Sequence, residues 1–359
     1  MSSLLTIIVP VYNVEPYLDK CLSSLLNQTV LNHHVVIVND GSTDSSGEIA
    51  KRYAVSHPAL FQYIEQENCG LGAARNKGLQ YANTPYVTFL DSDDWQDCYF
   101  VENFIKEISR HEETPDIIFT LPTIYDAVSR HSLQWYDAPL FESIFFPNKN
   151  FPLPSREVSI SDRPDLLALE PNANRRIFSL NFIQKIKLQF PEGIKWEDIQ
   201  PHFLALHYAK RCIGIHNTGF FYRINTANQI TAGTGAGRLD MIPVFKSAFQ
   251  TAEDHHFSAH EITYIARMLC NYTTWSIQVT NTEFIKPLLD QFHSLFVSID
   301  KKHFKDYYHT CLRMRKDILL VSVLRSPFYN ILSDYFYRHL FERITEKVFS
   351  IMNRFRRTK

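Results

Sequence analysis

Short apolar runs rich in β-branched residues recur through the first third of the chain and predict buried strands. The first run, at residues 4–9, is nearly continuous, which is typical of a strand covered on both faces. The expected strands are residues 4–9, 35–38, 61–64, 86–90 and 117–119. Between them, apolar residues recur at helical spacing, most clearly at Leu18, Cys21, Leu22, Leu25 and Leu26. Further helices are expected near residues 48–53 and 73–81.

This alternation of strands and helices predicts an α/β fold, with a mostly parallel central sheet flanked by helices. Ligands of such sheets bind outside the carboxyl ends of the strands. Clusters of polar residues occupy those ends here, at residues 10–13, 39–44 and 91–94. The pattern therefore predicts one binding site, built from three loops at the same edge of the sheet.

The alternation of strands and helices ends after the fifth expected strand, and two further parts of the chain have different sequence patterns. Residues 120–170 are rich in proline and irregular, and we expect loops there with an antiparallel hairpin. Glycines cluster at Gly233, Gly235 and Gly237, and a long run with few prolines or glycines follows, with apolar residues at helical spacing. We therefore predict two domains, an α/β domain at residues 1–232 and a helical domain at residues 233–359.

The amino-acid composition argues against some classes of protein but does not identify the function. Apolar residues make up 45% of the chain and aromatic residues 14%, which is enough for a large buried core. The net charge of −1 argues against a nucleic-acid partner. Six scattered cysteines indicate ordinary thiols in a reducing compartment. The sequence shows no secretory leader and no apolar run long enough to span a bilayer. A cytoplasmic location is therefore expected, either free or at the inner face of the plasma membrane.

The acidic segment FLDSDDW follows the strand expected at residues 86–90. Asp91 and Asp93 can face one hard cation, and carboxylate oxygens suit Mg²⁺ or Mn²⁺. The alternative is that these residues only make a turn or cap a helix. Three like charges so close together are costly without a counter-ion, which favours the metal site.

Three other segments carry polar residues whose structural explanation, for each segment alone, is at least as good as a functional one. In VNDGSTD, Asp40 could accept a hydrogen bond from a nucleobase, but the segment is also a good turn and helix cap. In ENCGLGAARNKG, Arg75 occupies the third glycine position of a dinucleotide fingerprint, which excludes a dehydrogenase and makes Arg75 a candidate anion anchor. In KWEDIQPHF, Glu197 and Asp198 could supply a general base or simply begin a helix.

Taken in order, these segments resemble glycosyltransferase family 2, a group of inverting enzymes with the GT-A nucleotide-sugar-binding fold, here of the bacterial surface-polysaccharide type. The resemblance runs through IIVPVYN, VVIVNDGSTD, ENCGLGAARNKG, FLDSDDW and KWEDIQPHF to FFYRINTANQIT, over residues 4–231. Each segment alone is weak, whereas all of them in this order and spacing are specific.

The resemblance implies a role for each matching position. It places Pro10, Tyr12 and Asp40 at the nucleobase and ribose, with Asn68 and Arg75 closing over the donor. Asp91, Ser92 and Asp93 form the family's DxD motif, in which Asp91 and Asp93 bind Mn²⁺ or Mg²⁺ with the diphosphate. Glu197 and Asp198 match the acid pair of the acceptor site, with Asp198 as the catalytic base. Arg223 is expected near the diphosphate. The residues that match the family's motifs are Pro10, Tyr12, Asp40, Asn68, Arg75, Asp91, Ser92, Asp93, Glu197, Asp198 and Arg223.

The resulting prediction is a metal-dependent transfer of a sugar from a nucleotide-sugar, with a UDP-sugar expected, to a hydroxyl of a glycan or lipid-linked acceptor. The pathways considered are capsule, lipopolysaccharide and teichoic-type polymers. One alternative is a nucleotidyltransferase, but PVYNVEP lacks the Gly-rich basic loop of such enzymes. Another is a non-catalytic relative, which should have lost Asp93 or Asp198.

The last part of the chain suggests a further contact. Residues 338–359 mix Phe, Leu and Ile with seven Lys or Arg, a composition that fits either a basic amphipathic helix on anionic lipid or a helix packed on its own domain. Peripheral membrane contact therefore stays open at this point. The sequence names neither the sugar nor the oligomeric state.

Overall fold

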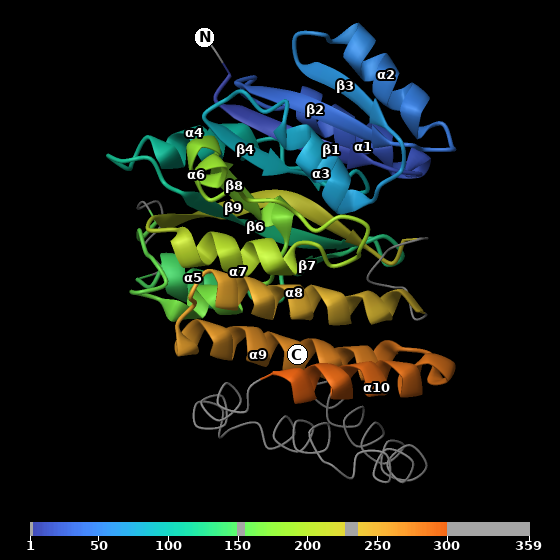
Figure 1. The fold of residues 1–359 in the computed structure, drawn as a ribbon. Coiled ribbons are helices and arrows are strands. Elements are labelled where there is room, and N and C mark those ends of the chain that lie inside the picture. The colour runs from blue at the N-terminus through green and yellow to red at the C-terminus, as the bar shows by residue number, and fades with distance from the viewer. Residues whose placement is uncertain (1–2, 149–154, 227–235, 300–359) are drawn as a thin grey trace. The chain divides into compact units, whose positions relative to one another are not determined.

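The structure is a computed structural model that describes residues 3–148, 155–226 and 236–299 of the 359-residue chain. The chain divides into two compact units, residues 1–232 and 233–359, and each is described by itself. The first unit is a sheet flanked by helices, and the described part of the second, residues 236–299, is helical (Figure 1). The basic segment at residues 338–359 lies outside the described residues.

Four parallel strands form the first half of the sheet. They are β1 (Leu5–Val11), β2 (His33–Asp40), β3 (Phe61–Gln66) and β4 (Tyr86–Phe89), in the spatial order β3-β2-β1-β4. All seven residues of β1 are buried, which explains its continuous apolar sequence. The register places Pro10 opposite Val38, and Asp40 opposite Gln66. The polar loops after β1, β2 and β3 therefore leave the sheet at one edge.

The second half of the sheet mixes both strand directions and extends the order through β8-β6-β9-β5. Its strands are β8 (Arg176–Ser179), β6 (Ile117–Asp126), β9 (Cys212–Ile224) and β5 (Trp95–Gln96), with β7 (Ser132–Gln134) paired to β6 as a hairpin. Strand β8 runs antiparallel to both β4 and β6, whereas β6 and β9 are parallel. The hairpin predicted within residues 120–170 is thus present, as β6 and β7.

Helices cover the sheet between its strands. They are α1 (Glu15–Leu26), α2 (Ser46–Ser56), α3 (Leu71–Leu79), α4 (Phe100–Ile108), α5 (Ala138–Phe145), α6 (Leu180–Lys185) and α7 (Ile199–Tyr208), with short 3₁₀ turns at Pro164–Ala168 and Ala173–Arg175. The apolar face of α1 is buried as its spacing predicts, through Leu18, Cys21, Leu22 and Leu25. Helix α3 packs on β1 and β2 (Figure 1).

The second unit contains a 3₁₀ turn at Ala236–Asp240 and the helices α8 (Met241–Asp254), α9 (Ala259–Val279) and α10 (Thr282–Ser298). Helix α9 begins with a capping box in which Ser258 and Glu261 bond each other's backbone N–H, which satisfies two donors at the helix start. Among the described residues, no helix has the length and apolar character that crossing a membrane requires.

The first residue of β2 makes the stability of this unit depend on pH. His33 is buried, and burial lowers its pKa to about 4, against the opposing effect of its hydrogen bond to the Leu25 carbonyl. Between pH 6.5 and 4 the unfolded chain binds the proton and the folded chain does not, so stability is lost as pH falls through this window. At pH 5 the loss from this group is about 2 kcal/mol.

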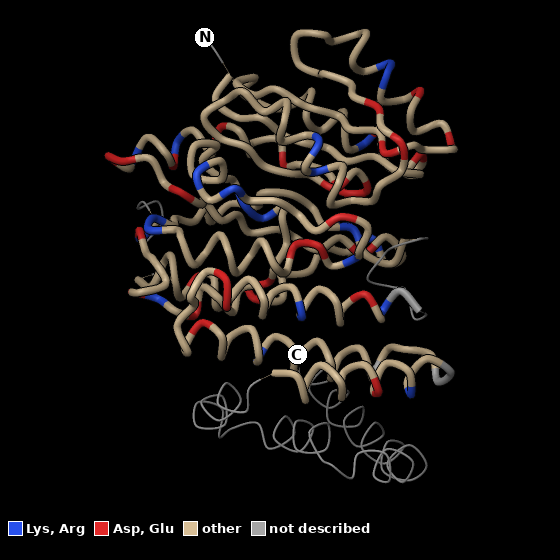
Figure 2. Tube along the Cα trace, viewed as in Figure 1, with Lys and Arg blue, Asp and Glu red and all other residues tan. Residues whose placement is uncertain are grey.

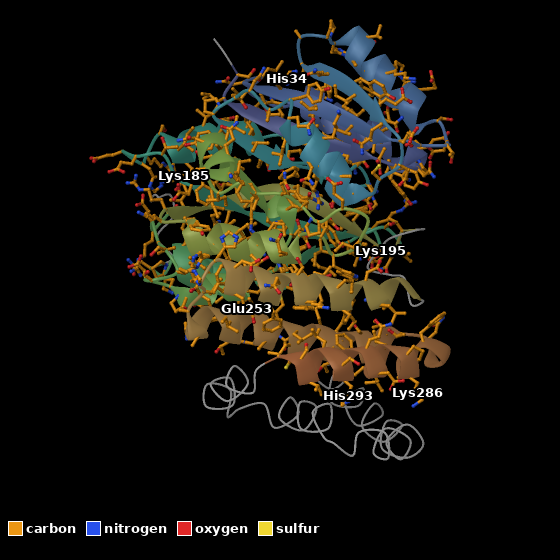
Figure 3. All side chains as sticks on the ribbon, viewed as in Figure 1. His34, Lys185, Lys195, Glu253, Lys286 and His293 are labelled. Carbon is orange, nitrogen blue, oxygen red and sulfur yellow. The ribbon has the colours of Figure 1, made fainter. Side chains whose placement is uncertain are left out.

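Replacing His33 with glutamine should therefore make unfolding less sensitive to pH. Urea unfolding at pH 7 and pH 5 measures the difference, and the amide nitrogen of glutamine can keep the bond to Leu25. The matched control is His34→Gln, on the same strand but only half-buried (Figure 3). If the glutamine variant loses as much stability as wild type between the two pH values, His33 is not the group responsible.

Candidate functional site

The donor side of the site is a set of loops after β1, β2 and β3 that are tied to one another. Asn13 follows β1, and its side-chain oxygen accepts a hydrogen bond from the Thr43 N–H at 2.8 Å in the loop after β2. The backbone of Asn68 approaches Gly41 so closely that a Cβ at Gly41 would lie 2.9 Å from its nitrogen. These contacts bring the predicted donor-binding positions of three strands to one edge of the sheet.

The predicted nucleotide residues differ in how they face solvent. Tyr12 and Asn68 are exposed on the loops, whereas Pro10 is buried in β1. Asp40 is also buried, and its carboxylate accepts hydrogen bonds from the backbone N–H groups of Cys69 and Gly70 and from Gln66. Asp40 therefore holds the loop that begins α3, in addition to any contact with a base that its remaining lone pairs allow.

The acidic loop after β4 continues the same edge. The backbone N–H of Leu90 bonds the Ile8 carbonyl at 2.9 Å, which sets Asp91 beside the end of β1. Burial, and next the charge of Asp91, raise the pKa of Asp93 to about 6. Ser92 is buried between these two acids.

Asp94 has a different environment from the two acids before it. One of its oxygens accepts the backbone N–H of Arg223 at 2.8 Å, and the other is buried without a hydrogen-bond partner among the described residues. Burial, then the charges of Asp93 and Asp91, hold its pKa well above the usual range. Asp94 therefore supports the loop through its bond to Arg223, whereas Asp91 and Asp93 are the acids of the predicted cation site.

The donor set at Asp91 and Asp93 fits a hard divalent cation. Both ligands are carboxylate oxygens. The raised pKa of Asp93 means that burial and Asp91 destabilise its negative charge, and a nearby cation would stabilise that charge. Within residues 3–148, 155–226 and 236–299, no cluster of three or more His, Cys, Asp or Glu side chains is arranged to hold a metal. A cation at this loop would thus need water or phosphate oxygens to complete its coordination shell.

Arg223 braces the acidic loop. Its Nε donates to the backbone carbonyl of Asp93 at 2.8 Å, and its guanidinium lies 4.7 Å from the centroid of the Trp95 ring and 5.0 Å from that of Tyr17. Together with the N–H bond to Asp94, these contacts tie β9 to the loop at two points. The residue expected near the diphosphate therefore also fixes the shape of the loop that would carry the metal.

Arg75 links the two acidic motifs. Its side chain is 2% exposed, and its Nη2 donates to Asp91 at 2.8 Å while Nη1 donates to Glu197. Burial alone would lower the pKa of Arg75, but the charges of Asp91, Glu197 and Asp198 outweigh burial and raise it. Arg75 is thus held between two carboxylates, one in the loop after β4 and one in the turn before α7, and its expected closure over the donor stays a prediction.

The acid pair lies at the start of α7. Trp196 has a positive φ of 67°, a strained conformation for a large residue, which directs the chain into the helix. Glu197 is buried against Arg75, and Asp198 is the N-cap residue of α7, although its side chain makes no capping hydrogen bond. Burial, then the negative charge of Glu197, raise the pKa of Asp198 well above its usual range. Burial and this neighbouring charge make Asp198 a stronger base than an ordinary aspartate, which suits a group that takes a proton from a hydroxyl.

Helix α3 holds the chain segment that leads to the acid pair, a role that sequence reasoning missed. The amide of Asn76 bonds both the N–H and the carbonyl of Phe190, each at 2.8 Å. Gly72 packs against the carbonyl of Pro191, which a Cβ would approach to 2.0 Å. Neither contact has a local sequence signal, because each depends on a partner more than a hundred residues away.

Replacing Gly72 with alanine should therefore destabilise the first unit. The new methyl group would collide with a backbone carbonyl, which cannot rotate away, and overpacking of this kind costs about 1–3 kcal/mol. Gly78→Ala is the comparison on the same helix, where the Cβ would lie 2.3 Å from Cγ2 of the buried Ile8, so this variant should also be destabilised, by a clash with a side chain and not with the backbone. Urea unfolding measures both variants; a Gly72→Ala protein as stable as wild type would contradict the close packing.

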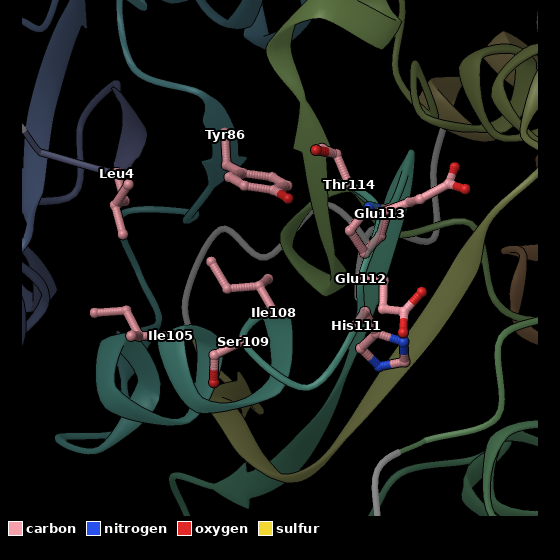
Figure 4. A pocket seen from close by; sticks show the side chains of 10 residues that line it. Leu4, Tyr86, Ile105, Ile108, Ser109, His111, Glu112, Glu113 and Thr114 are labelled. Carbon is pink, nitrogen blue, oxygen red and sulfur yellow. The ribbon is translucent and has the colours of Figure 1, made fainter.

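A pocket of about 310 Å³ lies away from these residues (Figure 4). Leu4 and Tyr86, which line it, lie where β1 and β4 begin, and Ile105 and Ile108 come from α4. The pocket thus lies at the amino ends of the strands, whereas the polar loops lie at their carboxyl ends. Along the described trace, Lys and Arg are interspersed with Asp and Glu, in keeping with the net charge of −1 (Figure 2).

The first part of the chain is similar to a known protein family. Residues 6–156 match the family model described as glycosyl transferase family 2. A segment of 109 residues is 55% identical to the glycosyltransferase GlyA of Streptococcus pneumoniae, and it covers 30% of this chain and 15% of GlyA. The chain therefore spans only a small part of the length of that curated relative.

Two solved structures share the fold. The S. aureus TarS 1-349 structure in complex with UDP-GlcNAc has a TM-score of 0.67 at 19% identity, over 91% of both chains. The mannosyltransferase PcManGT from Pyrobaculum calidifontis, in complex with GDP-Man and Mn²⁺, has a TM-score of 0.52 at 15% identity, over 90% of this chain and 87% of that one. The GT-A fold expected from the sequence is confirmed by these likenesses together with the family match.

Proposed function

The chain carries a domain of glycosyl transferase family 2, and on that premise we propose that it is an inverting, metal-dependent glycosyltransferase. Its donor is a nucleotide-sugar, with a UDP-sugar as the first candidate, and its acceptor is a hydroxyl of a bacterial surface glycan. The observation that carries the proposal is the position of Arg75, which touches Asp91 and Glu197 at once. Through this contact, the predicted donor acid and the predicted acceptor pair form one site.

In the proposed complex, the loops after the parallel strands hold the nucleotide. Tyr12 and Asn68 are exposed where they can contact the base and ribose, next to Pro10 and the Asp40 carboxylate. Asp91 and Asp93 would hold Mn²⁺ or Mg²⁺, and this ion would supply positive charge to balance that of the departing nucleoside diphosphate. Ser92 lies between them, and Arg223 keeps the loop in shape beside the diphosphate.

Asp198 is the proposed base. Its carboxylate takes the proton of the acceptor hydroxyl while the hydroxyl oxygen forms a bond to the anomeric carbon. The bond between that carbon and the diphosphate oxygen breaks on the opposite face, and the electron pair leaves with the diphosphate. One displacement inverts the configuration. Glu197, buried beside Asp198, keeps the pKa of Asp198 high and stays bound to Arg75.

Hydrolysis of a panel of UDP- and GDP-sugars, with Mn²⁺ or with EDTA, tests this proposal. A glycosyltransferase slowly transfers sugar to water, so one donor should release its nucleoside diphosphate faster than the others, and only with metal. Release of a nucleoside monophosphate together with a sugar 1-phosphate would instead indicate nucleotidyl chemistry. A protein that binds these donors without cleaving any of them would be a non-catalytic relative.

The place of action and the pathway are also proposals. Capsule, lipopolysaccharide and teichoic-type polymers are all built on lipid-linked or growing glycans, which suits an enzyme at the inner face of the plasma membrane. The basic composition of residues 338–359 supports such a contact. Co-sedimentation of the full chain with anionic and with neutral vesicles tests whether the protein binds a membrane. Binding that needs anionic lipid and weakens with salt would indicate an electrostatic contact with the lipid headgroups.

A further inference from the structure

We propose that Arg75 is a positioning residue that couples donor binding at Asp91 to the arrangement of the acid pair at Glu197 and Asp198. The inference rests on the proposed function, because it concerns the same donor and the same base. It assigns to Arg75 an effect on both halves of the reaction without direct contact with the donor phosphates. The two acids that Arg75 bridges come from the end of β4 and from the turn before α7.

The surroundings of Arg75 leave it little freedom. Its guanidinium lies 5.8 Å from the ring centroid of Phe89 and 5.3 Å from that of Phe190, and its Nε is buried with no hydrogen-bond partner among the described residues. Each terminal nitrogen therefore has one carboxylate, and no water-exposed route offers an alternative for either arm. Moving Asp91 must shift the guanidinium or break its bond.

The two carboxylates differ in their access to a ligand. The Asp91 side chain is 26% exposed and faces the loops of the donor side, whereas the Glu197 side chain is 6% exposed. A cation or diphosphate that binds next to Asp91 interacts with the same carboxylate that is ion-paired with Arg75. The strengths of the two ion pairs of Arg75, with Asp91 and with Glu197, then change. The electrostatic interaction between Arg75 and Asp198 changes with them. By reciprocity, a change at Glu197 alters donor affinity.

Arginine is suited to this link for a geometric reason. Its planar fork offers two terminal nitrogens in fixed directions, so that one residue can bond two carboxylates on different elements. Lysine has a single ammonium group on a flexible stem and cannot reproduce the fork, although it keeps the charge. Arg75→Lys therefore separates two-armed coupling from simple charge neutralisation.

The experiment is a double-mutant cycle on donor-product affinity. Calorimetry measures the Kd of UDP with Mn²⁺ for wild type, Asp91→Asn, Glu197→Gln and the double variant. Arg75 bonds both Asp91 and Glu197, and the charges of the two acids also act on each other, so we expect their effects on Kd to be non-additive by at least about threefold. In an Arg75→Lys background the same cycle should be additive within about twofold.

Additive effects of Asp91→Asn and Glu197→Gln in the native Arg75 background overturn the inference, whether or not the Arg75→Lys protein folds. The matched control is Arg175→Lys, which alters another fully buried arginine with a carboxylate partner, Asp137, at 2.7 Å. This variant should lower the urea midpoint but leave the coupling intact. If wild type binds neither UDP nor GDP with Mn²⁺, the proposed function fails as well, so the two failures are distinguishable.

Discussion

The Asp198→Asn variant should lose transfer by about 10²- to 10⁴-fold, the usual contribution of a general base, while it binds the donor almost as wild type does. Asparagine has nearly the shape of aspartate but cannot take the acceptor proton. The side chain of Asp198 makes no capping hydrogen bond at α7, so the substitution removes no bond on which the helix start depends. Nucleoside diphosphate release measures transfer, and calorimetry with UDP and Mn²⁺ measures binding.

The ratio of the two effects decides the assignment. An equal loss of binding and turnover would mean that Asp198 supports the donor site and is not the base. Glu197→Gln is the matched comparison in the same turn, since it disturbs the contact with Arg75 and should therefore reduce donor affinity as well as turnover. If Glu197→Gln lost only turnover while Asp198→Asn lost both donor affinity and turnover, Glu197 would be the base and Asp198 the supporting acid.

Replacing Asp93 with alanine should remove the response to metal. Two carboxylates would become one, and stabilisation of the leaving diphosphate by a metal is worth several kcal/mol, so transfer should fall by about 10²-fold or more. Titration of activity and of UDP affinity with Mn²⁺ measures the effect. An unchanged metal response in the Asp93→Ala protein would exclude Asp93 as a ligand.

Asp94→Asn is the control for charge at this loop. Asp94 accepts the Arg223 N–H through one carboxylate oxygen, and the amide oxygen of asparagine can still accept this bond. The metal response should therefore persist in this variant. Loss of that response in both variants would show that the shape of the loop, and not a ligand, had been changed.

The parallel half of the sheet was predictable because its strands have a simple sequence signature. β1 and β4 are buried on both faces, so they read as unbroken apolar runs, and the polar loops that follow them mark the site. The short strand β8 has no such signature. It begins at Arg176 and is a strand because β4 and β6 pair with it on both sides, a fact of tertiary structure.

The site was predicted as a set of positions, but not as a set of contacts. Asp91, Glu197 and Arg75 were all named, and they do meet. The inward direction of Arg75 could not be predicted, because an arginine suits a phosphate and a buried carboxylate equally well, and only the fold decides which one it reaches. The role of Asn76 is hidden for a related reason, since its partner Phe190 belongs to a distant segment of the chain.

The central claim is that a donor acid loop and an acceptor base act together to invert the anomeric carbon. Proton NMR of donor hydrolysis tests it without knowledge of the acceptor. With the donor identified in the panel, an α-linked nucleotide-sugar and Mn²⁺ should first yield the β-anomer of the free sugar, before mutarotation mixes the anomers. The Asp198→Asn protein should yield neither at a comparable rate. Initial release of the α-anomer would show retention and contradict the account.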